Sequence, residues 1–283
     1  MTHILTLSCA DRPGIVHAVT RFLLDEKANI VEAAQFDDAS TRLFFMRVKF
    51  ELLDPGYRDA SGLAQRFESI AKEFGMKAQI APADARMKTV IMVSQLGHCL
   101  NDLLFRYRSG LLPIDIRAIV SNHRTYYQLA ASYEIPFHHI QVTPQTKAGA
   151  EAKLFEIFDD EGAELLVLAR YMQVLSENAC QRFSGRAINI HHSFLPSFKG
   201  ARPYAQAHDR GVKLIGATAH YITADLDEGP IIEQDVERAD HAAGVDELTA
   251  LGRDVESVVL ARAIKWHAEH RILLNGRKTV VFR

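Results

Sequence analysis

The sequence predicts two domains: an α+β, ferredoxin-like domain over residues 1–81 and an α/β doubly wound, Rossmann-like domain over residues 87–283. Three observations lead to this prediction. The first eighty residues follow the order strand, helix, strand, strand, helix, strand. Residues 82–86 are small, polar and proline-bounded, which is typical of a linker. Beyond them, short apolar runs alternate with helical patterns, which favours a parallel sheet covered by helices.

The first strand and helix of the ferredoxin-like domain are predicted from one short segment. Ile4–Ser8 is an apolar run and predicts the strand. Asp11 and Pro13 follow it and predict a helix start, with Asp11 as the cap and Pro13 in the first turn. The helix should end near residues 25–27. Its apolar stripe consists of Ile15, Val16, Val19, Phe22 and Leu23.

The remaining elements of this domain have equally clear patterns. Strands are predicted over Asn29–Phe36 and Leu43–Phe50, with a hairpin turn at residues 37–40. Apolar residues alternate along the second strand, which predicts that one face is buried: Phe44, Met46, Val48 and Phe50 against Phe45, Arg47 and Lys49. A helix follows on the spacing of Leu63, Phe67, Ile70 and Phe74. Gly75 is placed to end this helix, and residues 77–81 return as a strand.

In the second domain, buried strands alternate with helices. Short apolar runs predict the strands Thr89–Ser94, Ile114–Val120 and Leu165–Ala169. Helical patterns cover Leu100–Arg108, Ala148–Phe158 and a last amphipathic helix with Val255, Val258, Val259, Ala263 and Trp266; a strand over Lys278–Phe282 follows. In such a sheet we expect the functional site beyond the carboxyl ends of the strands.

Composition excludes several classes of partner. The formal net charge is −2, with 33 Lys and Arg against 35 Asp and Glu, so we expect no nucleic-acid partner and no anionic membrane surface.

The cysteines Cys9, Cys99 and Cys180 are scattered without a C-x-x-C spacing, which indicates a reducing compartment and argues against structural zinc. The first residues contain no basic leader and no apolar run approaches bilayer length, so we expect a cytoplasmic protein.

The strongest chemical signal lies in two segments about thirty residues apart. Asn189 and His191 fall on a predicted strand, where alternation places both side chains on one face. Asp227 lies in an acidic loop that can reach the imidazole. A carboxamide, an imidazole and a carboxylate suit attack on an acyl carbonyl: the amide stabilises the oxyanion, the imidazole moves a proton, and the carboxylate orients the imidazole.

These segments, Asn189–Pro196 and His220–Pro230, resemble the catalytic core of the folate-dependent formyltransferase family. The resemblance covers roughly residues 87 to 283. It implies that Asn189 is the oxyanion donor, that His191 is the general acid and base, and that Asp227 is the partner of His191 and anchors a catalytic water.

The same resemblance implies a folate pocket. The segment Ala169–Ser176 resembles the pterin-binding segment of the family, and the loop 224–229, whose turn Gly229 and Pro230 would set, forms a second wall. Apolar side chains would cover the ring while backbone groups pair with its edge. The residues implied are Met172, Gln173, Val174, Leu175, Ala224 and Leu226, with His220 and Ser193 supporting the catalytic residues.

The paired histidines do not predict a metal site. Alternation on a strand turns His192 to the face opposite His191, so we expect His192 to serve in packing. His138 and His139 form another adjacent pair, and adjacent histidines on a strand diverge and make poor chelates. We therefore expect no metal. The resemblance to the family also implies no cofactor, because 10-formyltetrahydrofolate would be the substrate.

The segment Asp11–Val16 resembles the first strand–helix junction of an ACT domain. ACT domains commonly bind amino acids and pair through their sheets. The resemblance implies an amino-acid effector site at Asp11, Gly14 and Ile15, and a homo-oligomer formed through these domains. The alternative is a ferredoxin-like domain used only for assembly.

The loop after the first strand of the second domain separates the reactions of the family. It contains His98 and Cys99 in Gly-His-Cys-Leu-x-Asp-Leu-Leu, which resembles the formyltetrahydrofolate deformylases. That resemblance implies hydrolysis of 10-formyltetrahydrofolate to tetrahydrofolate and formate. The alternatives are formyl transfer to an unphosphorylated amine and a non-catalytic folate or amino-acid sensor. Two physiological roles fit hydrolysis: balancing one-carbon pools for purine synthesis, and recycling tetrahydrofolate in a catabolic pathway.

Overall fold

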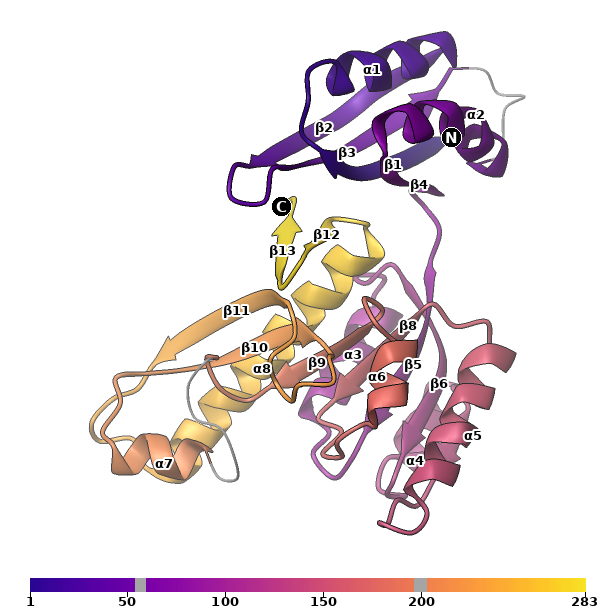
Figure 1. Cartoon of the computed structure of the whole chain (residues 1–283). Helices are drawn as coiled ribbons and strands as arrows, with labels where there is room; N and C mark the ends of the chain where they lie inside the picture. The colour runs from indigo at the N-terminus through magenta and orange to yellow at the C-terminus, as the bar shows by residue number, and fades with distance from the viewer. Residues whose placement is uncertain (54–59, 196–202) are drawn as a thin grey trace. The chain divides into compact units, whose positions relative to one another are not determined.

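The chain folds into two compact units in the computed structural model (Figure 1). The structure describes residues 1–53, 60–195 and 203–283. The first unit contains Met1–Ala85 and, in addition, Glu269–Arg283 from the end of the chain. The second unit is Arg86–Ala268. The predicted second domain runs to residue 283, so its last fifteen residues lie in the other unit.

The first unit has the predicted ferredoxin-like fold. Its elements are β1 (Thr2–Ala10), α1 (Ile15–Asp25), β2 (Ala28–Asp38), β3 (Leu43–Leu52), α2 (Ala60–Phe74) and β4 (Lys77–Pro82). The strands form an antiparallel sheet in the order β2-β3-β1-β4. Both helices contribute to one core with the sheet; Val19 of α1 and Leu63 of α2 are completely buried in it. The core therefore lies between the helical layer and one face of the sheet.

The predicted start of α1 is wrong, because Asp11 does not cap the helix and Pro13 does not open it. The helix begins at Ile15, directly after Gly14, and no side chain caps it. Gly14 has φ 97°, a left-handed conformation that costs glycine little. The backbone N–H of Asp11 instead donates to the carbonyl oxygen of Arg42 at 3.0 Å. The predicted end of α2 is confirmed, since Gly75 follows its last residue with φ 62°.

The prediction that β3 buries only one face is also wrong. Phe45 and Arg47, on the second face, are 0% and 2% exposed. The Arg47 guanidinium donates to the carbonyl oxygens of Glu269 and His270 at 3.1 and 3.2 Å and pairs with Glu32 at 2.8 Å. These contacts hold the end of the chain within the first unit. It continues as the hairpin β12 (Ile272–Asn275) and β13 (Lys278–Val281).

The second unit is a doubly wound α/β domain, as predicted. The sheet contains β5 (Met87–Val93), β6 (Ile114–Ser121), β7 (Phe137–His139), β8 (Leu165–Ala169), β9 (Ala187–His191), β10 (Leu214–Tyr221) and β11 (Ile231–Arg238). Its helices are α3 (His98–Arg108), α4 (Tyr127–Ser132), α5 (Lys147–Asp160), α6 (Glu177–Arg182), α7 (Pro203–Asp209) and α8 (Val245–Ala268). The strand order is β11-β10-β9-β8-β5-β6-β7.

The pairing of the strands positions the site. The five strands from β9 to β7 pair in parallel, whereas β10 and β11 add an antiparallel edge that the sequence pattern does not show. All five residues of β8 are buried. Leu168 of β8 pairs with Asn189 of β9, so the two strands end side by side. His220 of β10 pairs with Asn189 from the other side.

The cysteines and the lengths of the helices bear on the compartment expected from the sequence. Cys9, Cys99 and Cys180 are all buried and form no disulfide. Within residues 1–53, 60–195 and 203–283, no helix combines the length and the apolar character that a bilayer crossing requires.

Arg47→Met should loosen the C-terminal hairpin without unfolding the sheet. The change removes donors to two carbonyl oxygens, and a hydrogen bond to a charged group contributes about 1.5–3 kcal/mol. We expect the amides of β12 and β13 to exchange with solvent about tenfold faster or more. Native-state hydrogen exchange measures this. The control is Arg21→Met, which breaks an exposed ion pair with Asp25 and should leave the hairpin unchanged.

Candidate active site

A cavity of about 250 Å³ opens at the carboxyl ends of β8 and β9 in the second unit. It is lined by all six residues that the sequence implies for folate binding: Met172, Gln173, Val174, Leu175, Ala224 and Leu226. The side chains of Met172, Val174 and Leu226 are 56–60% exposed. Apolar side chains left open around a cavity with a few polar groups suit a flat, hydrogen-bonding ring.

The cavity contains Asn189, His191 and Asp227 together. Asn189 and His191 belong to β9, and Asp227 lies in the loop after β10. The imidazole Nδ1 of His191 lies 3.3 Å from Oδ2 of Asp227. Burial alone would raise the pKa of Asp227, but the hydrogen bond and charge of His191 outweigh it and lower that pKa. With Nδ1 directed at the carboxylate, Nε2 is the nitrogen left for proton transfer; it is buried and has no hydrogen-bond partner among the described residues.

The loop that carries Asp227 has a constrained backbone. Asp227 has φ 58°, a left-handed conformation that aspartate tolerates better than most residues. Gly229 packs against the end of β10, where an added Cβ would lie 1.7 Å from the carbonyl oxygen of Tyr221. Only glycine fits this approach. The backbone at residues 227–229 thus fixes where the carboxylate meets His191.

His220 orients the carboxamide of Asn189. Its Nδ1 lies 2.9 Å from the carbonyl oxygen of Tyr221, which can only accept, so Nδ1 carries the hydrogen and Nε2 the lone pair. Nε2 then accepts one amide N–H of Asn189 at 3.3 Å. Burial lowers the pKa of His220 and keeps the ring neutral. The second amide N–H of Asn189 remains for a substrate oxygen.

Ser193 lies behind the site and does not line the cavity. Its carbonyl oxygen accepts the hydroxyl of Thr218 at 2.9 Å, and the same hydroxyl accepts the N–H of Leu195 at 3.1 Å. These two bonds attach the segment after β9 to Thr218 on strand β10. Pro196, which ends the sequence motif, lies outside the described residues.

The prediction that His192 points away from His191 is wrong. The two rings stack with centroids 5.0 Å apart and an interplanar angle of 22°, and both line the cavity. Alternation applies only within a strand, and β9 ends at His191, after which the chain bends. The sequence reasoning also missed Arg170, which lies beside His192 on the cavity wall. Its signal was a charged residue directly after the wholly apolar run Leu165–Ala169.

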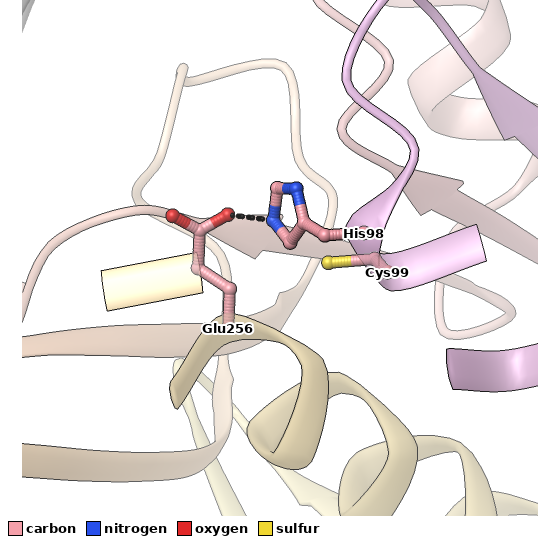
Figure 2. Close-up of side chains that lie close together, drawn as sticks. All are labelled: His98, Cys99 and Glu256. Carbon is pink, nitrogen blue, oxygen red and sulfur yellow. Dashed lines mark hydrogen bonds and ion pairs between the residues drawn. The ribbon is translucent and has the colours of Figure 1, made fainter. Parts of the chain in front are cut away.

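A cluster of three polar side chains lies next to Arg170 on the cavity wall. His98, Cys99 and Glu256 bring ligand-type atoms within 4.8 Å of one another, and Figure 2 shows the carboxylate of Glu256 facing the ring of His98. That carboxylate accepts from His98 at 2.8 Å and from Tyr204 at 2.6 Å, and it pairs with Arg170 at 3.3 Å. Two hydrogen-bond donors and the positive charge of Arg170 already compensate this carboxylate, which disfavours a bound cation there.

The implied effector residues lie at the junction of β1 and α1 in the first unit. Asp11 and Gly14 are exposed. Ile15 is 2% exposed because its side chain belongs to the core of that unit. An effector at this junction can therefore meet the backbone of Ile15 but not its side chain.

Comparison with known proteins places this chain in a class. Residues 87–264 match the family described as "Formyl transferase", and residues 3–56 match the ACT domain. A Corynebacterium formyltetrahydrofolate deformylase is 50% identical, over 99% of this chain and 98% of its own.

Solved structures agree over the whole length. The formyltetrahydrofolate deformylase of Burkholderia mallei has a TM-score of 0.96 and 52% identity, over 100% of this chain and 99% of its own. That of Pseudomonas putida has a TM-score of 0.95 and 47% identity, over 100% of both chains. The chain belongs to the formyltetrahydrofolate deformylase family.

The assigned tautomer of His220 can be tested in solution. Nitrogen-15 spectra of the histidine rings should show His220 protonated on Nδ1. Because burial lowers its pKa, the ring should stay neutral as the pH falls through about 6.5, the ordinary value. His220→Gln identifies the signal. An Nε2-protonated ring, or one that titrates at the ordinary value, would contradict the assignment.

Gly229→Ala should destabilise the second unit. The new Cβ cannot fit beside the carbonyl oxygen of Tyr221, and backbone displacement of this kind costs on the order of 2 kcal/mol or more. Urea unfolding measures the loss. Gly149→Ala is the matched control, since nothing lies within 4 Å of that Cβ and α5 should gain up to about 1 kcal/mol.

Proposed function

We propose that the protein hydrolyses 10-formyltetrahydrofolate to tetrahydrofolate and formate in the cavity at the ends of β8 and β9. The chain is a hydrolase of the deformylase family. One observation carries the assignment of residues: His191 lines the cavity, contacts Asp227 through one ring nitrogen, and has no hydrogen-bond partner for the other nitrogen among the described residues. The apolar wall of Met172, Val174 and Leu226 offers the surface for the folate ring.

In the first step, water attacks the formyl carbon. Nε2 of His191 takes the proton from this water, and Asp227 stabilises the resulting imidazolium through Nδ1. Oδ1 of Asp227 lies 3.8 Å from Nε2 of His220, too far for a hydrogen bond, so this oxygen is available to position the water. The carbonyl electron pair moves onto the formyl oxygen. The second amide N–H of Asn189 stabilises that oxyanion.

In the second step, the tetrahedral intermediate collapses. The bond between the formyl carbon and the folate nitrogen breaks, and the imidazolium of His191 returns its proton to that nitrogen. Tetrahydrofolate leaves as the neutral amine. Formic acid loses its proton to solvent and leaves as formate. His191 ends the cycle neutral, still oriented by Asp227.

The ACT domain and the buried cysteines support further proposals. We propose that the ACT domain binds an amino acid near Asp11 and Gly14 and that chains associate through these domains into a homo-oligomer. The three buried thiols favour a reducing, cytoplasmic location. There the reaction would balance the one-carbon pool that purine synthesis uses.

Asp227→Asn, His191→Asn and Asn189→Ala should each lower kcat at least about a hundredfold, because each removes a group that acts on the transition state. Formate release from 10-formyltetrahydrofolate, without an amine present, measures the effect. Asp225→Asn is the matched control, an exposed carboxylate in the same loop that should keep full activity. Near-full activity in any of the three variants would contradict the assigned roles. Formylated amine in place of formate would indicate transfer.

A further inference from the structure

A hydrogen bond from Arg170 defines the protonation state of His192. Nη1 of Arg170 lies 2.5 Å from Nδ1 of His192. A guanidinium can only donate, so Nδ1 of His192 must carry a lone pair and Nε2 the hydrogen. His192 is thereby held as a neutral imidazole.

Arg170 has little freedom to release this contact. It follows β8 directly, is only 7% exposed and has φ 63°, a conformation that costs a non-glycine residue energy and persists only where surrounding contacts impose it. Its Nε lies 3.3 Å from Oε2 of Glu256, which is 1% exposed. Burial alone would raise the pKa of Glu256, but the His98 hydrogen bond and the Arg170 charge outweigh it and keep the carboxylate ionised.

Glu256 is in turn fixed by three elements. It belongs to α8, its Oε2 accepts from His98 of α3, and its Oε1 accepts the hydroxyl of Tyr204 of α7. The ring of Tyr204 lies on Gly252, one turn earlier on α8, where an added Cβ would meet that ring at 2.2 Å. Figure 2 shows Glu256 directed from α8 toward His98 at the start of α3.

We infer that Glu256 and Arg170 are positioning residues, which hold His192 as a neutral ring stacked on His191 so that His191 is the imidazole that changes charge during catalysis. This inference rests on the proposed function, in which His191 becomes an imidazolium. A second positive charge on a ring 5.0 Å away would oppose that step.

Some of the groups that face His192 lower its pKa and others raise it. Burial is the largest cause that lowers its pKa, followed by the charges of Arg170 and His191; Glu256 and Asp227 oppose them, and the pKa is about 4. Tyr204 also faces His192, with ring centroids 6.3 Å apart, and burial raises its pKa, so it stays a neutral donor. Since burial and Arg170 prevail, loss of Arg170 should let His192 take up a proton at a higher pH.

The test follows His192 by nitrogen-15 spectra of the full-length protein, with the signal identified by its loss in His192→Gln. In the wild type, His192 should titrate near pH 4. In Arg170→Met it should titrate at a higher pH than in the wild type, because burial still lowers the pKa but the Arg170 charge no longer does. Arg170→Lys, which keeps the charge, should restore a low value. Tyr204→Phe is the matched control: it removes a bond to Glu256 but keeps the ring and Arg170, and should titrate as the wild type does.

The kinetic test is the ratio of kcat at pH 8 to kcat at pH 6. A ring with a pKa of about 6.5 is about three-quarters protonated at pH 6 and almost wholly neutral at pH 8. The ratio should therefore be larger in Arg170→Met than in the wild type, by up to about fourfold, whatever the absolute rate. Adding His192→Gln to Arg170→Met should remove this excess.

The outcomes separate the two proposals. A wild type that releases no formate contradicts the proposed function. A wild type that releases formate while His192 titrates at the ordinary value overturns the present inference. So does an Arg170→Met protein in which neither the titration nor the ratio changes. If Arg170→Met does not fold, the wild-type and Arg170→Lys titrations still decide.

Discussion

The parallel pairing of β8 with β9 is the constraint on which the site depends. The register that joins Leu168 to Asn189 sets the ends of the two strands, Ala169 and His191, beside each other at one edge of the sheet. Both strands stop there, so both chains turn over the end of the sheet together. Side chains far apart in sequence thus reach one cavity with their backbones held by the sheet. Such a rigid base suits groups that must keep fixed distances during a reaction.

The hydrogen-bond partners of three neighbouring histidines differ, and with them the ring nitrogen that can carry a proton. His220 is protonated on Nδ1 because a carbonyl oxygen faces it. His192 is protonated on Nε2 because the Arg170 guanidinium faces its other nitrogen. His191 faces a carboxylate with one nitrogen and the cavity with the other. Two rings are therefore held neutral, whereas the proposed mechanism assigns the proton transfer to the third, and the neighbours of each ring produce this difference.

Buried charge plays a structural role in both units. In the first, Arg47 is enclosed between Glu32 and two backbone carbonyl groups near the end of the chain. In the second, Glu256 joins α3, α7 and α8 to the end of β8 through His98, Tyr204 and Arg170. Each buried charge must find partners from distant segments, because leaving it unpaired is costly. The partners therefore fix how those segments meet.

The sequence by itself determined the fold classes, most element positions, the cavity wall and the grouping of Asn189, His191 and Asp227, because these follow from local periodicity and a long motif. Only the tertiary structure decided what depends on distant partners or on where an element stops. The return of the chain end to Arg47 is one such feature, and the network of Arg170 and Glu256 is another. His192 shows the physical reason most clearly: alternation predicts its direction only while the strand continues, and the strand ends one residue earlier.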